Sequence, residues 1–269
     1  MQARLLKEIV ELVLAMGYAV FLLLVRRHPS RVVMYYHSVK ERDTRQFEKQ
    51  MAYLANKCRV VQASEIRTVP AEGTESLVAL TFDDAFVSVL ENAVPILKRH
   101  GLTAGFFVPA GNMGQQPRWR MSDDCADRNE TVMSPEQIAE LYNEGFEIFS
   151  HTASHLLLTE IDENRLNSEL LESKEKLEKV IGREVLGISY PYGGHDATVC
   201  NAAKRAGYNL GFTNVPEVVD CSPDDMRIGR FAVSPGDGML KFRLKVKGAY
   251  RMTKHLQSLK RFLCTGWRW

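Results

Sequence analysis

The 269-residue chain has little net charge and no pattern of paired cysteines. Its 35 Lys and Arg residues nearly balance 33 Asp and Glu residues, for a formal net charge of +2, which excludes a globally basic nucleic-acid-binding protein. The five cysteines are odd in number and lack paired spacing. They therefore indicate free thiols in a reducing compartment rather than a disulfide framework. The sequence also lacks internal repeats and low-complexity segments, and its length suits one large domain or two small ones.

Acidic residues are missing from the C-terminal end. Residues 241–269 contain nine Lys and Arg residues and no Asp or Glu, so the rest of the chain carries a net charge of −7. This segment interleaves basic groups with Leu, Phe and Trp side chains, which suits an anionic membrane surface. We interpret it as a basic amphipathic tail, with a solvated outer face of the domain as the alternative. No nucleic-acid-binding module is recognisable, so we expect no nucleic-acid partner.

Charged residues are also scarce near the N-terminus. Between Ile9 and Val25, Glu11 is the only charged residue, and a helix of that length would extend about 26 Å, slightly less than a hydrocarbon core. We expect residues 1–30 to form a membrane anchor, either spanning the bilayer or half-inserted, and a buried first helix is the alternative. Basic residues are denser after this segment than before it, which favours a cytoplasmic position for the rest of the chain.

From residue 31 onward, short apolar segments alternate with amphipathic ones. We expect strands at 32–36, 77–82, 104–108, 146–150, 185–190 and 208–212. We expect helices to begin at residues 44, 86, 134, 162 and 196. Strand–helix alternation at this spacing predicts parallel strands wrapped by helices. An α/β barrel alone would fill this length, so we assign residues 31–240 to one catalytic domain.

Two of the predicted strands end in groups that bind metals. One strand leads directly into Asp83 and Asp84, and another leads directly into His151 and His155. Two imidazoles four residues apart and one carboxylate can hold a divalent ion with positions left open for water and substrate, which is typical of a catalytic metal site. The second carboxylate is then available for the reaction. The pattern predicts a metal-dependent hydrolase.

Each cluster alone also has a structural interpretation. An Asp pair after a strand often caps the next helix, and a single His-x-x-x-His pair is more often structural than ligating. In parallel α/β barrels, however, catalytic residues lie at the C-terminal ends of the strands. The two clusters, together with His37 and the Pro191–Tyr192 pair, all fall just past predicted strands. This shared position favours an active site.

Three short motifs occur in order along the chain. Residues 81–84 read Thr-Phe-Asp-Asp, residues 150–155 read Ser-His-Thr-Ala-Ser-His, and residues 190–193 read Tyr-Pro-Tyr-Gly. Together with Tyr-Tyr-His-Ser-Val at 35–39, they resemble the motifs of the NodB-type polysaccharide deacetylases, a carbohydrate esterase family. The similarity covers roughly residues 32–235. It implies a distorted parallel (β/α) barrel and a divalent metal ion, commonly zinc, with cobalt or nickel as substitutes.

The resemblance also implies a role for each motif residue. Asp83 would be the general base that takes a proton from water. Pro191 and Tyr192 would line the acetyl pocket, with the Tyr192 backbone N–H donating to the oxyanion. The metal ion would be held by Asp84, His151 and His155.

Two features depart from the family pattern. The third motif often begins with Arg two residues before the proline, and that position is Ser189 here. We predict that Arg230 supplies the missing guanidinium to the Asp83 carboxylate, with a surface arginine as the alternative. The late Leu-x-His motif that usually provides the general acid is not recognisable. His37 is our candidate for that acid because it leaves the first strand on the same barrel face, and a structural histidine is the alternative.

These features together predict a metal-dependent N-deacetylase of N-acetylated sugars. The terminal segments suggest a membrane-associated enzyme at a bacterial inner membrane, with its catalytic domain on the cytoplasmic side and a surface or lipid-linked glycan as substrate. One alternative is an amidohydrolase of the same fold that acts on a small non-sugar amide. Another is a catalytically silent glycan-binding protein, which Ser189 and the missing late histidine favour but the intact metal-ligand set opposes.

Overall fold

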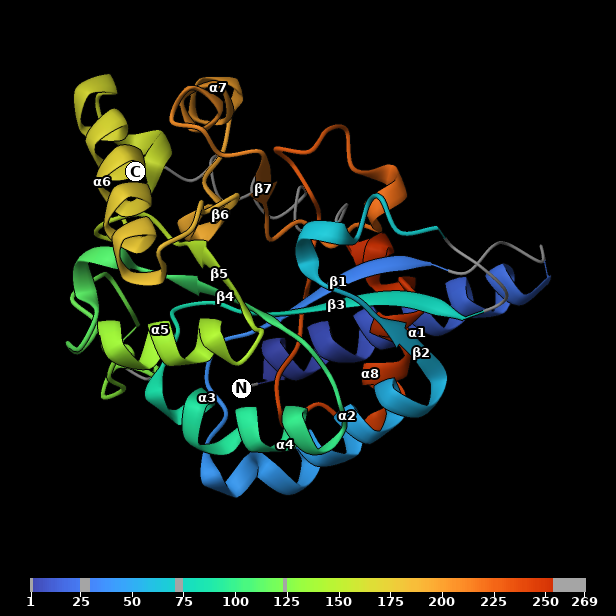
Figure 1. The fold of residues 1–269 in the computed structure, drawn as a ribbon. Helices are drawn as coiled ribbons and strands as arrows, with labels where there is room; N and C mark the ends of the chain where they lie inside the picture. The colour runs from blue at the N-terminus through green and yellow to red at the C-terminus, as the bar shows by residue number, and fades with distance from the viewer. Residues whose placement is uncertain (1, 25–29, 71–74, 123–124, 254–269) are drawn as a thin grey trace.

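The computed structural model describes residues 2–24, 30–70, 75–122 and 125–253. Its centre is a parallel sheet with strand order β7-β6-β5-β4-β3-β1-β8, and β2 pairs with β3 outside this path (Figure 1). This sheet confirms the predicted parallel α/β architecture. The strands are β1 (Arg31–Tyr36), β2 (Cys58–Val60), β3 (Ser76–Phe82), β4 (Gly105–Val108), β5 (Glu147–Ser150), β6 (Gly187–Ser189), β7 (Leu210–Phe212) and β8 (Phe231–Ala232).

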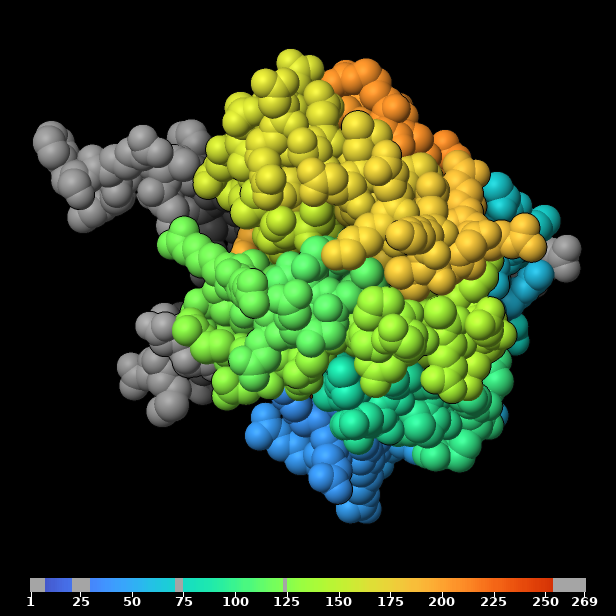
Figure 2. Space-filling view, turned by 60° about the vertical axis from the view of Figure 1, so that its left-hand side comes forward, coloured from blue at the N-terminus to red at the C-terminus, as the bar shows by residue number. Residues whose placement is uncertain are grey.

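Helices connect successive strands and pack on the outer face of the sheet. Figure 2 shows α6 in yellow, α5 in lime, α4 in teal and α2 in blue following one another down this outer surface. The helices are α1 (Gln2–Leu24), α2 (Thr44–Lys57), α3 (Val87–Asn92), α4 (Val94–Arg99), α5 (Pro135–Asn143), α6 (Glu163–Ile181), α7 (Ala197–Arg205) and α8 (Met239–Val246).

Local sequence signals explain where several helices begin and end. Ser134 and Gln137 form a reciprocal capping box at the start of α5, with Pro135 at the first helical position. Asp162 accepts a hydrogen bond from the Arg165 N–H at the start of α6. The single helix predicted from residue 86 is instead two short helices, α3 and α4. Proline at position 95 has no N–H for the carbonyl four residues earlier, so the helix breaks.

A short segment near the C-terminus brings the two edges of the sheet together. Ile228 pairs with Phe212 at the end of β7, and three residues later Phe231 pairs with Met34 of β1. The chain therefore crosses from one edge strand to the other within five residues. Arg230 lies in this crossing, at the seam of the curled sheet.

Apolar side chains fill both faces of the sheet because strand residues alternate in direction. The inner face holds the smaller cluster, which contains Phe107, Phe149 and Phe212. Gly105 and Gly187 make room for the Phe149 ring, since a Cβ atom at either position would lie 2.6 or 2.8 Å from it. The outer face holds the larger cluster against the helices.

The packed domain continues past the predicted boundary at residue 240. Phe242 and Val246 of α8 are buried in the larger core cluster, and so is Tyr250 in η7 (Ala249–Met252). The basic residues that suggested a tail from 241 onward therefore share this segment with core residues. The described part of the chain ends at Thr253, and the remainder of the predicted tail lies outside the described residues.

The N-terminal helix α1 packs against the C-terminal elements. It runs beside α8 and η7 (Figure 1), and Arg251 lies over the ring of Tyr18 at 5.9 Å. Ala15 is completely buried in this contact. None of the helices in the described ranges combines the length and the apolarity that a bilayer crossing requires.

A buried ion pair attaches α8 to the sheet, and it provides a test of this packing. Lys245 donates to the Asp237 carboxylate at 2.5 Å and to the Ala232 carbonyl at 2.6 Å.

Replacing Lys245 with Met leaves a buried carboxylate with fewer partners, so we expect the free energy of unfolding to fall by about 3 kcal/mol. Urea denaturation at pH 7 measures this change. Lys247→Met removes the same charge from an exposed position of the same segment and should leave stability nearly unchanged. Equal midpoints for the two variants would contradict this account of the segment.

Candidate metal centre and active site

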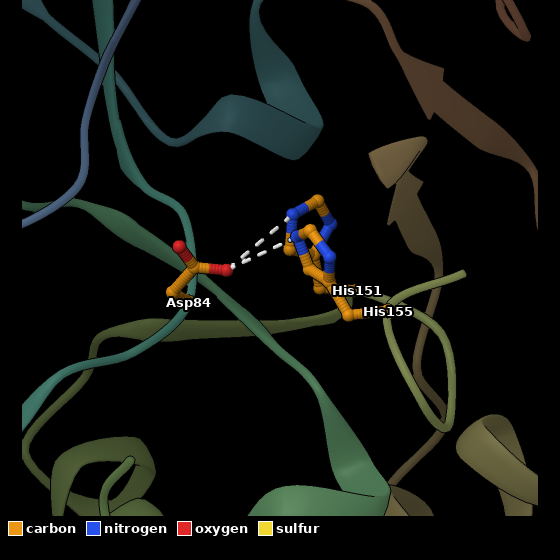
Figure 3. Close-up of side chains that lie close together, drawn as sticks. All are labelled: Asp84, His151 and His155. Atoms are coloured by element: carbon orange, nitrogen blue, oxygen red, sulfur yellow. Dashed lines mark ion pairs between the residues drawn. The ribbon is translucent and has the colours of Figure 1, made fainter. Parts of the chain in front are cut away.

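Three predicted metal ligands meet at the C-terminal ends of two strands. Asp84 follows β3, and His151 and His155 follow β5 (Figure 3). The Asp84 Oδ1 atom lies 3.4 Å from His155 Nε2 and 3.8 Å from His151 Nε2. One ligand atom from each residue lies within 4.8 Å of the other two, and all three residues are buried. Segments almost seventy residues apart thus form one compact donor set.

Unusual backbone conformations direct these side chains inward. Asp84 and His155 have φ angles of 67° and 57°, and Thr152 between the two histidines has a φ angle of 65°. Such left-handed conformations are costly for residues other than glycine, and they cluster at functional sites. The Thr152 side chain stabilises the turn by accepting a hydrogen bond from the His155 N–H at 3.0 Å.

The two histidines are neutral and suitably oriented for binding a cation. Burial lowers the pKa of His151 to about 4 and lowers the pKa of His155 well below its usual value. His151 Nδ1 lies 2.8 Å from the Ser189 carbonyl, which can only accept, so this nitrogen carries the proton. Its Nε2 lone pair therefore points toward Asp84. A hydrogen-bonded Nδ1 is the usual way in which proteins orient a ligating imidazole.

The donor set fits a divalent metal ion. Asp84 Oδ1 is buried and lacks a hydrogen-bond partner. Burial, followed by the neighbouring Asp83 carboxylate, raises the pKa of Asp84 well above its usual value. An oxygen buried in this way needs a cation, because leaving it unpaired is costly. Two imidazoles and one carboxylate are also the three-ligand type that zinc uses in catalytic sites.

Asp83 lies beside this set and is held by Arg230. The guanidinium donates from Nη1 to Asp83 Oδ1 at 2.7 Å and from Nη2 to Asp83 Oδ2 at 2.8 Å. Nη2 also donates to Ser189 Oγ at 2.6 Å. Ser189 occupies the position where the family often has arginine, so the guanidinium here reaches the same region from the seam of the sheet. Burial raises the pKa of Asp83, but the charge and hydrogen bonds of Arg230, together with His151 and His37, outweigh it and bring the pKa to about 2.

Arg230 itself is almost completely buried, with 1% of its surface exposed. Its guanidinium lies over the rings of Tyr35 at 4.5 Å and Phe107 at 5.0 Å. Its Nε donates to the Thr213 carbonyl at 3.0 Å. These contacts satisfy the guanidinium on its edges and faces, so its position is rigid. The alternative of a surface arginine is therefore wrong.

One cavity of ≈360 Å³ joins these groups. It is lined by the donor set, Asp83 and Arg230, and also by His37 and Tyr192. His37 is exposed, and its ring packs edge-on against Tyr35 with 5.6 Å between centroids. Tyr192 is 43% exposed and has a left-handed φ angle of 57°. Pro191 is buried and is not among the residues that line the cavity, so the structure does not place it in the predicted acetyl pocket.

Sequence reasoning missed the segment that covers one side of this cavity. Trp119 stacks on the His155 ring with 4.5 Å between centroids and an interplanar angle of 21°. Tyr192 Oη donates to the Arg120 carbonyl at 3.0 Å, which links this segment to the third motif. Both residues belong to the irregular stretch between β4 and α5. The signal that could have found them is its length, because long loops without regular structure are often functional.

Comparison with known proteins agrees with this site. The family model described as polysaccharide deacetylase matches residues 71–211. The poly-beta-1,6-N-acetyl-D-glucosamine N-deacetylase of Staphylococcus aureus is 26% identical over 201 residues, which are 70% of this chain and 66% of that protein. The chain therefore spans about two thirds of the length of this relative.

Solved structures agree on the fold. The structure of IcaB from Ammonifex degensii is similar with a TM-score of 0.65 and 25% identity, and the match covers 83% of this chain and 98% of that chain. The Streptococcus pyogenes deacetylase PplD in complex with acetate is similar with a TM-score of 0.68 and 20% identity, covering 82% and 99% of the two chains. These comparisons confirm the resemblance and the barrel fold predicted from the motifs.

Proposed function

This chain belongs to the polysaccharide deacetylase family, and we propose that it removes acetyl groups from the N-acetylhexosamine units of a surface glycan. The observation that carries this proposal is the Asp83–Arg230 pair lying beside Asp84, His151 and His155 in one cavity. Similarity to a poly-N-acetylglucosamine N-deacetylase supports the substrate class. The exposed positions of His37 and Tyr192 also suit a polymer that passes across the cavity.

We propose zinc as the ion held by Asp84, His151 and His155, with cobalt or nickel able to replace it. Such a cation supplies Lewis acidity, which makes water a stronger acid at neutral pH and polarises the acetyl carbonyl. Asp83 accepts the proton of the attacking water. With its pKa held at about 2, it is a weak base that is ionised throughout the neutral range. Such a weak base can take a proton only from a water that has become more acidic than bulk water. This requirement fits the position of Asp83 beside the metal ligands.

Two other residues complete the reaction in this proposal. The Tyr192 backbone N–H donates a hydrogen bond to the oxyanion as the amide carbon becomes tetrahedral. His37 donates a proton to the departing amine, since an imidazolium is a competent acid near neutral pH. Breakage of the C–N bond then releases acetate and a glucosamine-type amine. Pro191 supports the turn that presents Tyr192.

The role of His37 is tested by substitution. We expect His37→Gln to lower kcat by about a hundredfold, because glutamine cannot give a proton to the departing amine. Metal content should not change. His195→Gln is a matched control because His195 does not itself line the cavity; its ring lies behind the lining residue Tyr190, with 5.7 Å between centroids. A His37→Gln enzyme with the kcat of the wild type would mean that another group donates the proton.

The proposed function is tested by metal analysis and acetate release. The purified chain should hold about one equivalent of divalent ion. We expect it to release acetate from N-acetylglucosamine oligomers, with a polyprenyl-linked N-acetylhexosamine included to test the lipid-linked substrate. Small non-sugar N-acetyl amides form the comparison arm. Faster release from those amides would favour the same-fold amidohydrolase, and metal binding without any release would favour the silent glycan-binding protein.

A further inference from the structure

The outward side of α1 is apolar between residues 9 and 20, and the exposed Glu8 lies just before this stretch. Between residues 9 and 20, six large apolar side chains have exposed fractions of 41% to 62%. They recur at spacings of three and four residues, which places them along one side of the helix. Isolated exposed apolar residues are ordinary, but a continuous stripe marks a contact surface. The stripe consists of Ile9, Val10, Val13, Leu14, Met16 and Val20.

Exposed apolar residues are concentrated on this part of the molecule. Of the eleven large apolar side chains that the described residues leave exposed, eight lie on α1, α8 or η7. The two outside α1 are Leu240 and Met252, at 54% and 38% exposure. Because α8 and η7 pack directly against α1, all eight belong to one structural unit. Elsewhere in the described chain only Leu171, Leu186 and Tyr192 are exposed large apolar side chains.

The inward side of α1 packs on the larger core cluster through Leu12, Ala15 and Ala19, and it also meets charged groups. Burial lowers the pKa of Lys245, and Asp237 and then Glu11 of α1 act in the opposite direction. Tyr18 packs under the Arg251 guanidinium. The helix thus packs its inward side on the protein body and turns its apolar stripe toward the outside. The helix is therefore apolar on both sides, and its contacts with α8 and η7 hold the stripe outward.

The charge of the sequence segments that include α1, α8 and η7 indicates the partner of the stripe. Residues 1–31 and 241–269 contain fourteen of the chain's 35 Lys and Arg residues but only two of its 33 Asp and Glu residues. In the described part, Arg243 and Lys247 of the α8 segment are exposed. A second copy of the chain would bring two such basic sets together, whereas an anionic lipid surface would neutralise them.

We propose that α1 lies in the plane of an anionic lipid bilayer, with its apolar stripe inserted among the headgroups and the basic side chains of α8 and η7 beside it. This arrangement is that of an interfacial amphipathic helix, in which apolar burial and attraction to anionic lipid add together. The α1–α8–η7 unit then fixes the whole barrel on the membrane surface. The inference is independent of the deacetylase reaction, since none of these residues lines the cavity.

Vesicle binding tests the proposal directly. The full chain is mixed with two kinds of vesicle, one of phosphatidylcholine alone and one that also contains about 30% phosphatidylglycerol, an anionic lipid, which gives a strong surface potential. The bound fraction is measured by sedimentation. We expect binding to the anionic vesicles. Val13→Glu should weaken it at least about tenfold, because a charge replaces an inserted side chain. Lys247→Gln should weaken it about fivefold on anionic vesicles only.

Leu171→Glu is the matched control for the stripe. Leu171 lies on α6 and is 45% exposed, so the same change in chemistry occurs on another surface. It should bind vesicles as the wild type does. Acetate release from a soluble oligomer and the urea midpoint should be equal in all variants, because Val13 is 62% exposed. A loss of acetate release in every variant would count against the proposed reaction. It would not bear on the membrane surface, which vesicle binding tests.

Three results would overturn the proposal. The first is absence of binding to anionic vesicles, or equal binding by the wild type and Val13→Glu. The second is a dimer in sedimentation equilibrium that Val13→Glu dissociates without any vesicle binding, which would make a second copy the partner. The third is a clear loss of stability in Val13→Glu, which would mean that another part of this chain covers the stripe.

Discussion

Replacing Asp83 with Asn is expected to leave the metal in place and to lower kcat by about a thousandfold. The change keeps the size of the side chain and removes its ability to accept a proton. Replacing Asp84 with Asn is expected to lose the metal as well as the activity, because Asp84 Oδ1 is the oxygen that faces both imidazoles. Metal analysis of the purified variants and acetate release separate the two outcomes. The two variants differ only in which of two neighbouring aspartates is changed, yet they should lose activity for different reasons.

Asp127→Asn is the control for loss of a carboxylate in this cavity. Asp127 lines the same cavity and accepts a hydrogen bond from Ser38 at 2.5 Å, but it is not part of the donor set. We expect this variant to keep its metal and most of its activity. Normal turnover in Asp83→Asn would remove the assigned base. Full metal content in Asp84→Asn would remove the assigned ligand.

Replacing Arg230 with Met is expected to damage both stability and catalysis. The substitution leaves the buried Asp83 carboxylate without its cation, and breaking a buried pair in this way costs about 3–5 kcal/mol of unfolding free energy. Without the guanidinium, burial dominates and the pKa of Asp83 rises from about 2. The base is protonated below its pKa, so the acid limb of the pH–rate profile should move to higher pH. Urea denaturation and the pH dependence of kcat/KM measure the two effects.

Two further variants distinguish the ion pair from simple packing. Arg230→Lys keeps the charge but cannot reproduce the two parallel hydrogen bonds, so it should restore part of the stability and little of the activity. In the double variant Arg230→Met with Asp83→Asn, the buried charge is gone, and stability should recover relative to Arg230→Met alone. A double variant as unstable as the sum of the two single variants would show that the loss comes from packing of the arginine stem. An unchanged acid limb would show that Arg230 does not hold the base.

The metal donor set could be predicted from the sequence because each part is local. Asp84 directly follows one apolar strand and His151 directly follows another, and parallel strands bring their C-terminal ends to the same edge. A pair of imidazoles four residues apart needs only one turn of chain to converge. The structure adds the left-handed backbone conformation of Asp84 and His155. The sequence does not reveal it, because neither position is a glycine.

Other parts of the site depend on contacts between distant segments. Trp119 reaches His155 across an irregular stretch, and no periodicity predicts where such a stretch folds. In the sequence, the only reason to consider Arg230 is that Ser189 stands where the family often has arginine. Its pairing with Asp83 depends on the crossing between the edges of the sheet, which joins residues 147 positions apart.

The amino-acid order by itself determined the parallel strand–helix architecture, the strand ends that carry ligands, and the reaction class. These follow from short-range hydrophobic periodicity and from motifs whose residues act within a few positions of one another. Only the tertiary structure decided that residues 241–253 pack on the catalytic domain, that α1 turns its apolar stripe outward, and that a buried arginine from the seam holds the base. The physical reason is that burial, and with it the pKa of a carboxylate or the exposure of a helix face, is a property of what packs nearby rather than of the neighbouring sequence.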